Sequence, residues 1–370
     1  MTIAGHGDAS RDDAHMATAL AIAGRGRGRT SPNPMVGAVI VDDAGVVVGT
    51  GFHERAGDAH AEVHALRAAG AKARGATLYC TLEPCSHTGR TGPCAVAVAE
   101  AGVRRVVAAM QDPYHEVAGR GFAYLRDHGV DVQVGVREVE ARRLNEVFVT
   151  NVIARRPFVV AKIAMSLDGA VAAAPGARTA VSGAASQRHA QRVRAEVAAI
   201  GIGSGTLIAD DPVLTARDVW RTRPLIRVVF DRRLRMSPQA RLCGTLDRGP
   251  ILVVTTRAAV AGEGERARAL AGRGVTILAR DDEALAPAVA DLLGHGVTSL
   301  LLEGGPALHA AAWTAGIVDR VRCYVSPAAL GQGAVPWAMP PSFGLMALGP
   351  TRAEPLGADV LIEADVHRTH

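Results

Sequence analysis

Short apolar runs alternate with amphipathic stretches along the first half of the chain. Apolar residues at helical spacing predict a first helix over residues 14–23, with Asp12 or Asp13 as its cap. The pattern then predicts strands at 36–41 and 46–51, a helix over 60–71, a strand at 76–81, a helix over 94–101, a strand at 103–110, a helix over 118–128 and a strand at 130–134. This alternation is typical of an α/β layered domain.

A second cycle begins after Arg155-Arg156-Pro157, which interrupts the apolar pattern. We place the boundary within about five residues of Ala154, which gives one domain over 1–150 and another over 157–370. The second half is predicted to contain strands at 158–164, 198–203, 226–231, 251–255, 275–278, 299–303 and 321–326, and helices over 284–293 and 307–315. It too is predicted to be α/β, and no repeat relates the halves.

Composition narrows the class of protein. The 370 residues are 48% hydrophobic, 21% charged and only 4% aromatic, which excludes disordered and collagen-like classes. The formal net charge is +5, and nearly all basic residues are Arg, because Lys occurs only at Lys72 and Lys162. Arginine binds phosphate through its forked donors, so a phosphorylated small molecule suits this charge as well as nucleic acid does.

Cysteine usage and the apolar runs bear on the compartment. The five cysteines form an odd set without a regular framework, which favours a reducing environment. The opening MTIAGHGDASRDDAH lacks the cationic and apolar regions of a signal peptide. No apolar run approaches the roughly 18–20 residues of a membrane helix. We therefore expect a cytoplasmic protein without membrane contact.

His60, Glu62, Cys85 and Cys94 carry the most informative chemistry. A catalytic zinc takes three protein ligands and leaves a fourth position to water, whose pKa falls to about 7. His60, Cys85 and Cys94 are predicted to hold one Zn²⁺ per chain, and Glu62 to move protons in a hydrolytic deamination. Nucleobase deaminases share H-x-E with P-C-x-x-C, although here eight residues separate the two cysteines.

Other interpretations of this cluster stay open. Cys85 and Cys94 could be ordinary buried thiols, with His60 as a helix cap. His64, four residues after His60, could be a further ligand, which would favour a zinc-stabilised binding protein without enzymatic activity. A nucleic-acid substrate predicts a basic stripe interleaved with aromatic residues, and the three Trp, four Tyr and six Phe form none. The remaining cysteines are interpreted as small core residues: Cys80, Cys243 and Cys323.

Three segments of the first half form a recognisable set of motifs: TSPNPMVGAVIV (30–41), HAEVHAL (60–66) and TLEPCSHTGRTGPC (81–94). They resemble the bifunctional deaminase/reductase family of riboflavin biosynthesis, and the long cysteine spacing separates them from cytidine and transfer-RNA deaminases. The resemblance implies an N-terminal cytidine-deaminase-like α/β/α zinc domain. It also implies that Asn33 contacts the pyrimidine and that His87 and Arg90 bind the substrate, including its phosphate. Arg90 could equally be a solvated loop residue.

Segments of the second half are similar to the reductase of the same family: AKIAMSLDG (161–169), GSGTLIADDPVLTAR (203–217) and LLEGGPALHAAAW (301–313). The resemblance implies a dihydrofolate-reductase-like α/β domain that uses NADPH. GIGSGT (201–206) is not the Rossmann fingerprint, whereas the glycines after the strand at 299–303 would offer backbone amides to a phosphate. The implied NADPH contacts are Ala164, Thr206, Asp210, Gly305, Pro306, Ala307, Leu308, His309, Ala310 and Ala311. The implied reductase-substrate contacts are Arg194, Leu214, Arg217 and Glu303.

Further polar residues of the second half are weaker candidates. Lys162 and Asp168 lie near the end of a predicted strand, where they could serve the site or form a buried ion pair that serves only structure. Selection of NADPH requires a basic contact to its 2′-phosphate, and Arg232 or Arg257 could provide it or could lie on the surface.

The segment 170–182 departs from the family's pattern. The family has Ser-x-Trp-Ile-Thr/Ser, whereas residues 178–182 read Arg-Thr-Ala-Val-Ser. Arg178 replaces the serine that contacts substrate, Ala180 replaces the tryptophan that lies against the cofactor, and Ala170-Val171 replaces Arg-Thr. Alanine removes stacking area. Either another side chain compensates, or reduction is slow, altered or absent.

Together the resemblances of the two halves imply a two-domain enzyme of riboflavin biosynthesis. The first domain would deaminate 2,5-diamino-6-(5-phosphoribosylamino)pyrimidin-4-one to 5-amino-6-(5-phosphoribosylamino)uracil, and the second would reduce the ribose to a ribityl chain with NADPH. The alternative is a zinc deaminase of another nucleobase substrate with an inactive or altered reductase-like domain. The resemblance further implies a homo-oligomer, a dimer or a tetramer, and no nucleic-acid or membrane partner is expected.

Overall fold

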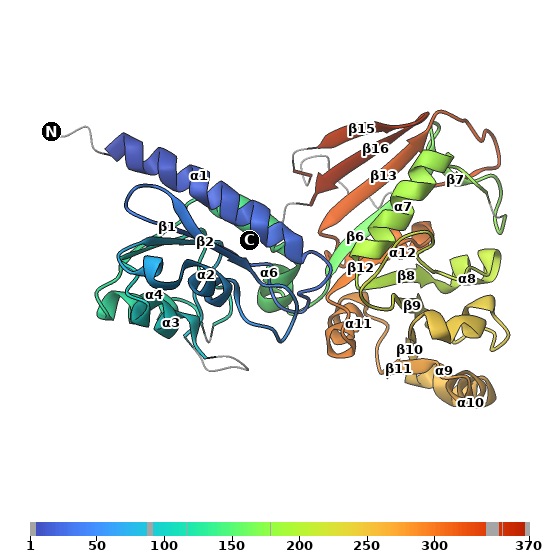
Figure 1. The fold of residues 1–370 in the computed structure, drawn as a ribbon. Coiled ribbons are helices and arrows are strands. Elements are labelled where there is room, and N and C mark those ends of the chain that lie inside the picture. Colours follow the sequence, from blue (N-terminus) through green and yellow to red (C-terminus); the bar gives the residue numbers. More distant parts are fainter. Residues whose placement is uncertain are drawn as a thin grey trace. The chain divides into compact units, whose positions relative to one another are not determined.

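The described residues form a five-stranded sheet, a nine-stranded sheet and a small two-stranded sheet (Figure 1). The computed structural model describes residues 5–86, 92–115, 117–177, 179–337, 348–349 and 351–366. The chain divides into a first unit, Met1–Arg155, and a second unit, Arg156–His370. Three candidate site residues lie outside the described residues: His87, Arg90 and Arg178.

The first unit contains a five-stranded mixed sheet in the order β2-β1-β3-β4-β5. Its strands are β1 (Gly37–Val41), β2 (Val47–Phe52), β3 (Thr77–Cys80), β4 (Arg105–Ala108) and β5 (Asp131–Val134). β1 pairs antiparallel with β2 and β3, whereas β3, β4 and β5 run parallel. The helices are α1 (Gly5–Ala23), α2 (Ala61–Ala69), α3 (Cys94–Glu100), α4 (Arg120–Asp127), α5 (Glu138–Leu144) and α6 (Glu146–Ile153), with short 3₁₀ turns at Gly24–Gly26 and Gly70–Ala73.

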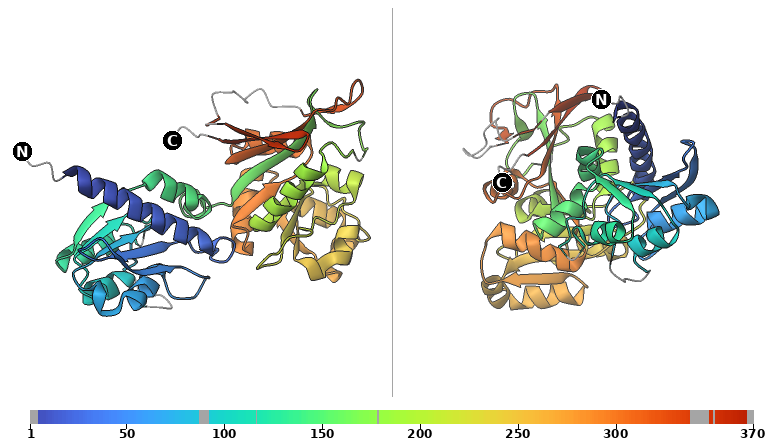
Figure 2. Two further views of the ribbon diagram at one scale, coloured as in Figure 1. Left: turned by 45° about the horizontal axis from the view of Figure 1, so that its top comes forward. Right: turned by 90° about the vertical axis from the view of Figure 1, so that its left-hand side faces the viewer.

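Helices cover both faces of this sheet, which explains why every residue of β1 is buried. A Cβ on Gly37 would lie 2.1 Å from the carbonyl oxygen of Ala19, so α1 packs directly on one face. On the other face, a Cβ on Gly51 would lie 2.3 Å from the carbonyl oxygen of Ala61 in α2. α1 and α2 accordingly lie on opposite sides of the sheet (Figure 2). This close packing fixes where α2 begins, and therefore where His60 lies.

The predicted cap of the first helix is wrong. α1 begins at Gly5, so Asp12 and Asp13 lie inside the helix. Asp12 is buried and receives two hydrogen bonds from Arg105, at 2.9 and 2.7 Å, while Asp13 pairs with Arg137 at 2.7 Å. Both carboxylates are bonded to side chains of other segments, and neither serves the helix N-terminus.

The second unit contains a nine-stranded sheet in the order β11-β10-β9-β8-β12-β6-β13-β16-β15 and a two-stranded sheet of β7 and β14. The strands are β6 (Phe158–Ser166), β7 (Ala170–Ala172), β8 (Ala199–Gly203), β9 (Ile226–Phe230), β10 (Ile251–Thr256), β11 (Thr276–Arg280), β12 (Ser299–Leu302), β13 (Arg320–Ser326), β14 (Val335–Pro336), β15 (Arg352–Leu356) and β16 (Asp359–Asp365). The helices are α7 (Ala184–Glu196), α8 (Ser204–Asp210), α9 (Arg257–Gly262), α10 (Gly264–Gly272), α11 (Leu285–Asp291) and α12 (Pro306–Thr314), with 3₁₀ segments at Arg241–Arg248 and Leu292–His295.

Seven neighbouring strands of this sheet, from β11 to β13, run parallel, and β16 pairs antiparallel with β13 and β15. The carboxyl ends of the parallel strands therefore meet at one edge of the sheet, which is where open α/β sheets bind ligands. The chain leaves that edge into α8 after β8, into α9 after β10 and into α12 after β12. The α/β prediction is confirmed for both units. No helix among the described residues is long and apolar enough to span a membrane.

Candidate active sites

Three side chains from separate elements converge in the first unit. His60 immediately precedes α2, Cys85 follows β3, and Cys94 begins α3. The His60 Nδ1 atom lies 3.2 Å from the Cys94 Sγ atom and 3.5 Å from the Cys85 Sγ atom. The possible metal-ligand atoms of these three side chains all lie within 4.8 Å of one another. Among the described residues, they are the group of His, Cys, Asp and Glu side chains that could hold a metal ion.

Backbone hydrogen bonds hold the two cysteines together. The Ala95 N–H donates to the Cys85 carbonyl at 3.0 Å, and the Cys94 N–H donates to the Cys85 Sγ atom at 3.4 Å. Both ends of the inter-cysteine loop are therefore fixed to each other. The contact between the thiols lowers the pKa of Cys85 and raises the pKa of Cys94, because one thiol donates to the other.

This donor set fits zinc. One imidazole nitrogen and two thiolates form a ligand set typical of Zn²⁺, and three protein ligands leave a position open. His60 occupies the N-cap position of α2 but makes no side-chain capping hydrogen bond, so the helix-cap interpretation is wrong. His64 lies outside the metal-ligand group, and its Cβ is close to Gly51 of β2.

Glu62 lies close to this group without belonging to it. Its side chain is buried in the first turn of α2, and its Oε2 atom has no hydrogen-bond partner among the described residues. Burial, reinforced by the charge of Cys85, raises the pKa of Glu62 to about 7. A carboxyl group with a pKa near neutrality is well suited to accept and return a proton.

A second histidine orients Asn33, a predicted pyrimidine contact. The Asn33 Nδ2 atom lies 3.3 Å from the Nε2 atom of His53, whose ring packs edge-on against His60 at 5.5 Å between centroids. His53 Nδ1 lies 3.3 Å from the Ala59 carbonyl, and burial lowers the pKa of His53. A neutral His53 that donates from Nδ1 accepts the Asn33 amide at Nε2. The Asn33 carbonyl oxygen is then available to a ligand.

The sequence analysis missed Glu83, which fixes the segment that carries Cys85. Its buried carboxylate accepts hydrogen bonds from the backbone N–H groups of Gly119 and Gly121, both at 2.9 Å, and of Asp112 and Phe122. A Cβ on Gly121 would lie 1.9 Å from the Pro84 carbonyl oxygen. The start of α4 is thereby held against the turn that delivers Cys85. A lone acidic residue beside the PC pair was the only signal in the sequence.

Two predicted substrate contacts of the second unit bind each other. Arg194 from α7 and Glu303 after β12 form a buried ion pair through two contacts of 2.7 Å. Arg194 also donates to the Thr215 carbonyl at 2.9 Å. Burial alone would raise the pKa of Glu303, but Arg194 outweighs it, and the pKa is lowered. The carboxylate is therefore held ionised at the carboxyl edge of the sheet.

Lys162 and Asp168 do not form a buried ion pair with each other. The Lys162 ammonium lies over the Tyr324 ring, 5.5 Å from its centroid. Asp168 is exposed, accepts backbone N–H groups of residues 330–331 and is hydrogen-bonded to the Ser166 hydroxyl. The hydrogen bond from Ser166 is the main cause that lowers the pKa of Asp168 to about 2. The ion-pair alternative is wrong because these contacts turn the Asp168 carboxylate to the following loop.

The predicted reductase-substrate residues on the loop after α8 differ in exposure. Leu214 is buried and has a φ of 55°, a left-handed conformation that is uncommon for a residue other than glycine. Arg217 is exposed, and its backbone N–H donates to the Gln191 side chain at 2.8 Å. Ala180, in the segment that departs from the family's pattern, is also exposed.

Predicted cofactor residues meet where α8 and α12 begin. The Thr206 hydroxyl accepts the Gly305 N–H at 3.0 Å, which ties the first turn of α8 to the N-cap of α12. His309 differs from its neighbours, because its buried ring is hydrogen-bonded to the Leu302 carbonyl at 3.1 Å. Its side chain therefore packs inside the unit. Ala164 in β6 and Asp210 at the end of α8 are partly buried.

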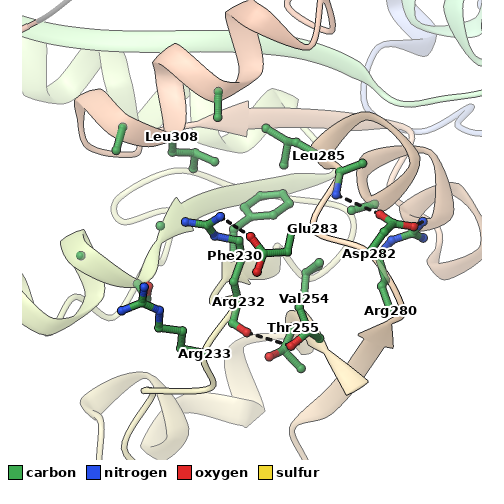
Figure 3. A pocket seen from close by; sticks show the side chains of 18 of the residues that line it. Phe230, Arg232, Arg233, Val254, Thr255, Arg280, Asp282, Glu283, Leu285 and Leu308 are labelled. Carbon is green, nitrogen blue, oxygen red and sulfur yellow. Dashed lines mark hydrogen bonds and ion pairs between the residues drawn. The ribbon is translucent and has the colours of Figure 1, made fainter. Parts of the chain in front are cut away.

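A cavity of about 500 Å³ opens at the carboxyl edge of the sheet (Figure 3). It is lined by the ends of β8 to β11 and by Ala307, Leu308 and Ala311 of α12. Arg232 lines it, whereas Arg257 does not and instead pairs with Asp281 at 2.6 Å. Backbone amides at a helix N-terminus, together with arginines, suit the phosphates of a dinucleotide such as NADPH.

Comparisons with known proteins agree with this geometry. Residues 157–362 match the RibD C-terminal domain, and residues 9–110 match the cytidine and deoxycytidylate deaminase zinc-binding region. Riboflavin biosynthesis protein RibD of Escherichia coli K12 is 40% identical over 341 residues, which cover 88% of this chain and 90% of that protein. Its counterpart in Aquifex aeolicus is 39% identical over 322 residues, covering 87% and 88%. The chain belongs to the RibD family.

Solved structures of the RibD family share this fold. Acinetobacter baumannii RibD has a TM-score of 0.85 at 35% identity, covering 97% of this chain and 100% of that one. A diaminohydroxyphosphoribosylaminopyrimidine deaminase/5-amino-6-(5-phosphoribosylamino)uracil reductase from Thermotoga maritima has a TM-score of 0.83 at 30% identity, with the same coverage. The resemblance inferred from the motifs and the fold class of both units are confirmed. The roles of individual residues remain predictions.

Glu83→Gln tests the contact that supports Cys85. Glutamine offers one acceptor oxygen and turns an NH₂ group toward backbone N–H donors, so buried donors lose their partner at a cost of about 1–3 kcal/mol each. We expect a lower urea-unfolding midpoint and faster release of zinc to a chelator. Glu54→Gln, at an exposed position of the same unit, is the control. Zinc release at the rate of the unaltered protein would contradict this role.

Glu62→Gln tests the burial of that carboxyl group in zinc-free protein. The folded pKa is raised from 4.5 to about 7, so the folded state holds a proton that the unfolded chain has already lost. The contribution of this group to the free energy of unfolding is therefore fully present below pH 4.5, and it is lost as the pH rises through 7. The variant should therefore gain stability over the unaltered protein at pH 8 relative to pH 5 in urea titrations. An equal difference at both pH values would exclude the raised pKa.

Proposed function

We propose that the first unit deaminates 2,5-diamino-6-(5-phosphoribosylamino)pyrimidin-4-one and that the second unit reduces the ribose of the product to a ribityl chain with NADPH. The observation that carries the proposal is the convergence of His60, Cys85 and Cys94 beside the unligated Glu62 in a chain of the RibD family. The Thermotoga maritima structure is named for both of these activities.

In the first unit, His60 Nδ1 and the two cysteine sulfurs would hold Zn²⁺. Zinc, when bound, lowers the pKa of water to about 7 and so supplies a nucleophile at neutral pH. Glu62 takes the proton from that water and then gives it to the amino group that leaves as ammonia. The Asn33 carbonyl oxygen, left available by His53, would accept a hydrogen bond from the pyrimidine. His87 and Arg90 are proposed to bind the substrate, including its phosphate.

In the second unit, NADPH supplies a hydride to the carbonyl carbon of the opened ribose. The oxygen of that carbonyl must gain one proton, and we assign the proton to Lys162, whose positive charge acts on Glu303. Arg194 holds Glu303 ionised and in place for the sugar. Arg217 and Leu214 are proposed as further substrate contacts. Thr206, Asp210, Ala164 and residues 305–311 are proposed to line the cofactor.

Two broader expectations accompany this proposal. The five cysteines are free thiols, which suits the reducing cytoplasm. A homodimer or homotetramer is expected from the family resemblance.

The test follows ammonia release and then NADPH oxidation by zinc-loaded protein given the phosphoribosylated diaminopyrimidinone. Glu62→Gln should reduce ammonia release by roughly 100- to 10,000-fold, the usual contribution of general acid–base catalysis. It should retain zinc and should still oxidise NADPH when given the deaminated intermediate. Glu54→Gln is the matched control. Absence of ammonia from unaltered protein would overturn the substrate, and ammonia without NADPH oxidation would overturn the reductase.

Ala180→Trp tests the departure in the 178–182 segment. Ala180 is exposed, so an indole has room there and can restore the stacking surface that the family's tryptophan supplies. We expect a lower KM for NADPH and unchanged ammonia release. Ala44→Trp, at an exposed turn of the first unit, controls for the added indole. An unchanged KM would mean that another side chain already provides the surface.

A further inference from the structure

The cavity at the carboxyl edge has an apolar floor and a charged rim. Phe230, Val254 and Leu308 contribute to the floor, and the rim is formed by arginines and by the adjacent acids Asp282 and Glu283. A flat apolar surface suits a purine ring, and guanidinium groups suit phosphate. What this cavity would bind rests on the proposed use of NADPH by the second unit.

The direction of a dinucleotide in this cavity follows from α12. The first turn of α12 lines one side through Ala307. The Gly305 N–H donates to Thr206, Pro306 has no N–H, and the Leu308 N–H donates to the Gly305 carbonyl, so the Ala307 N–H is the amide of this turn that suits the pyrophosphate. The adenosine end then extends toward the rim formed after β9 and β11. The Thr255 hydroxyl in that part of the cavity is buried, and it has no hydrogen-bond partner among the described residues.

Most arginines of the rim already have acidic partners. Arg232 pairs with Glu283, Arg280 pairs with Asp282 and Asp291, and Arg235 lies 3.8 Å from Asp231. Figure 3 shows Arg232 and Glu283 pointing toward each other across the cavity. Arg233 is exposed and, in the part of the chain that the structure describes, is the arginine of this cavity that forms no ion pair.

We infer that Arg233 binds the 2′-phosphate of NADPH, and that the ion pair between Arg232 and Glu283 limits how strongly the site prefers NADPH to NADH. An unpaired guanidinium can bond a phosphate without first breaking another contact. Arg232 must leave Glu283 before it can do the same.

Glu283 opposes this preference in two ways. Its carboxylate repels a 2′-phosphate, and it can accept a hydrogen bond from the free 2′-hydroxyl of NADH, the role that an acidic residue has in NAD-specific sites. Arg233 therefore favours a phosphate at the 2′ position of the cofactor, whereas Glu283 disfavours it. Their balance sets the discrimination between the two nucleotides.

Calorimetric titration of the full zinc-loaded chain with 2′,5′-ADP and with 5′-AMP tests this inference without turnover. Arg233→Ala should weaken 2′,5′-ADP by about 10- to 100-fold, the range for a charge-assisted hydrogen bond, and should leave 5′-AMP unchanged. Arg257→Ala removes the same charge outside the cavity and should alter neither. The effect of Arg233→Ala should shrink as salt is raised.

The companion variant is Glu283→Gln, with Asp281→Asn as its control outside the cavity. Glu283→Gln should tighten 2′,5′-ADP several-fold, because it frees Arg232 and removes a repulsive charge. Equal losses for 2′,5′-ADP and 5′-AMP in Arg233→Ala, or weaker 2′,5′-ADP binding in Glu283→Gln, would overturn the inference.

Direct titration with NADPH, followed by its fluorescence, separates the role of Arg233 from the proposed reductase activity. Unaltered protein that binds NADPH, together with an Arg233→Ala variant that keeps the full preference over NADH, would refute the role of Arg233 alone. Unaltered protein that binds neither nucleotide would instead refute the proposed reductase.

Discussion

Direct contact between α2 and β2 is the constraint on which the first unit depends. A Cβ on Gly49 would lie 2.4 Å from the Ala65 carbonyl oxygen, and one on Gly51 would lie 2.3 Å from that of Ala61. The helix can approach the strand only because these two positions lack side chains. That approach sets the position of His60 and Glu62 relative to the turn after β3. Backbone packing thus positions His60, a member of the metal-ligand group.

In the second unit the corresponding constraint is the parallel direction of seven strands. Each loop that follows a strand from β8 to β12 emerges at the same edge, so Asp231, Arg280 and Glu303 are gathered although they are far apart in the sequence. The buried pair of Arg194 and Glu303 shows one consequence. Each group compensates the charge of the other, so neither is buried with an unpaired charge.

The sequence predicted the elements that are apolar on both faces, and it predicted that His60, Cys85 and Cys94 meet. Strands such as β1, β8 and β12 are continuous apolar runs, and one histidine with two cysteines is a donor set typical of zinc. The sequence did not predict α7, which is rich in polar residues, or β15, which is an exposed edge strand. Asp12 was misassigned because a carboxylate before an apolar stretch resembles a cap, whereas its partners come from distant strands.

The sequence also gave no reason to choose three further residues as parts of a site: His53, Glu83 and Arg233. Their contacts are with residues that only folding brings close.

The hydrogen bonds that join Cys85 to Cys94 and Ala95 have a consequence for how the protein can evolve. These bonds join the two ends of the segment between the cysteines. The spacing of the two sulfur ligands is therefore held by its ends and does not depend on the residues in between. The sequence between the two cysteines can therefore vary without moving the metal ligands, as surface loops commonly do.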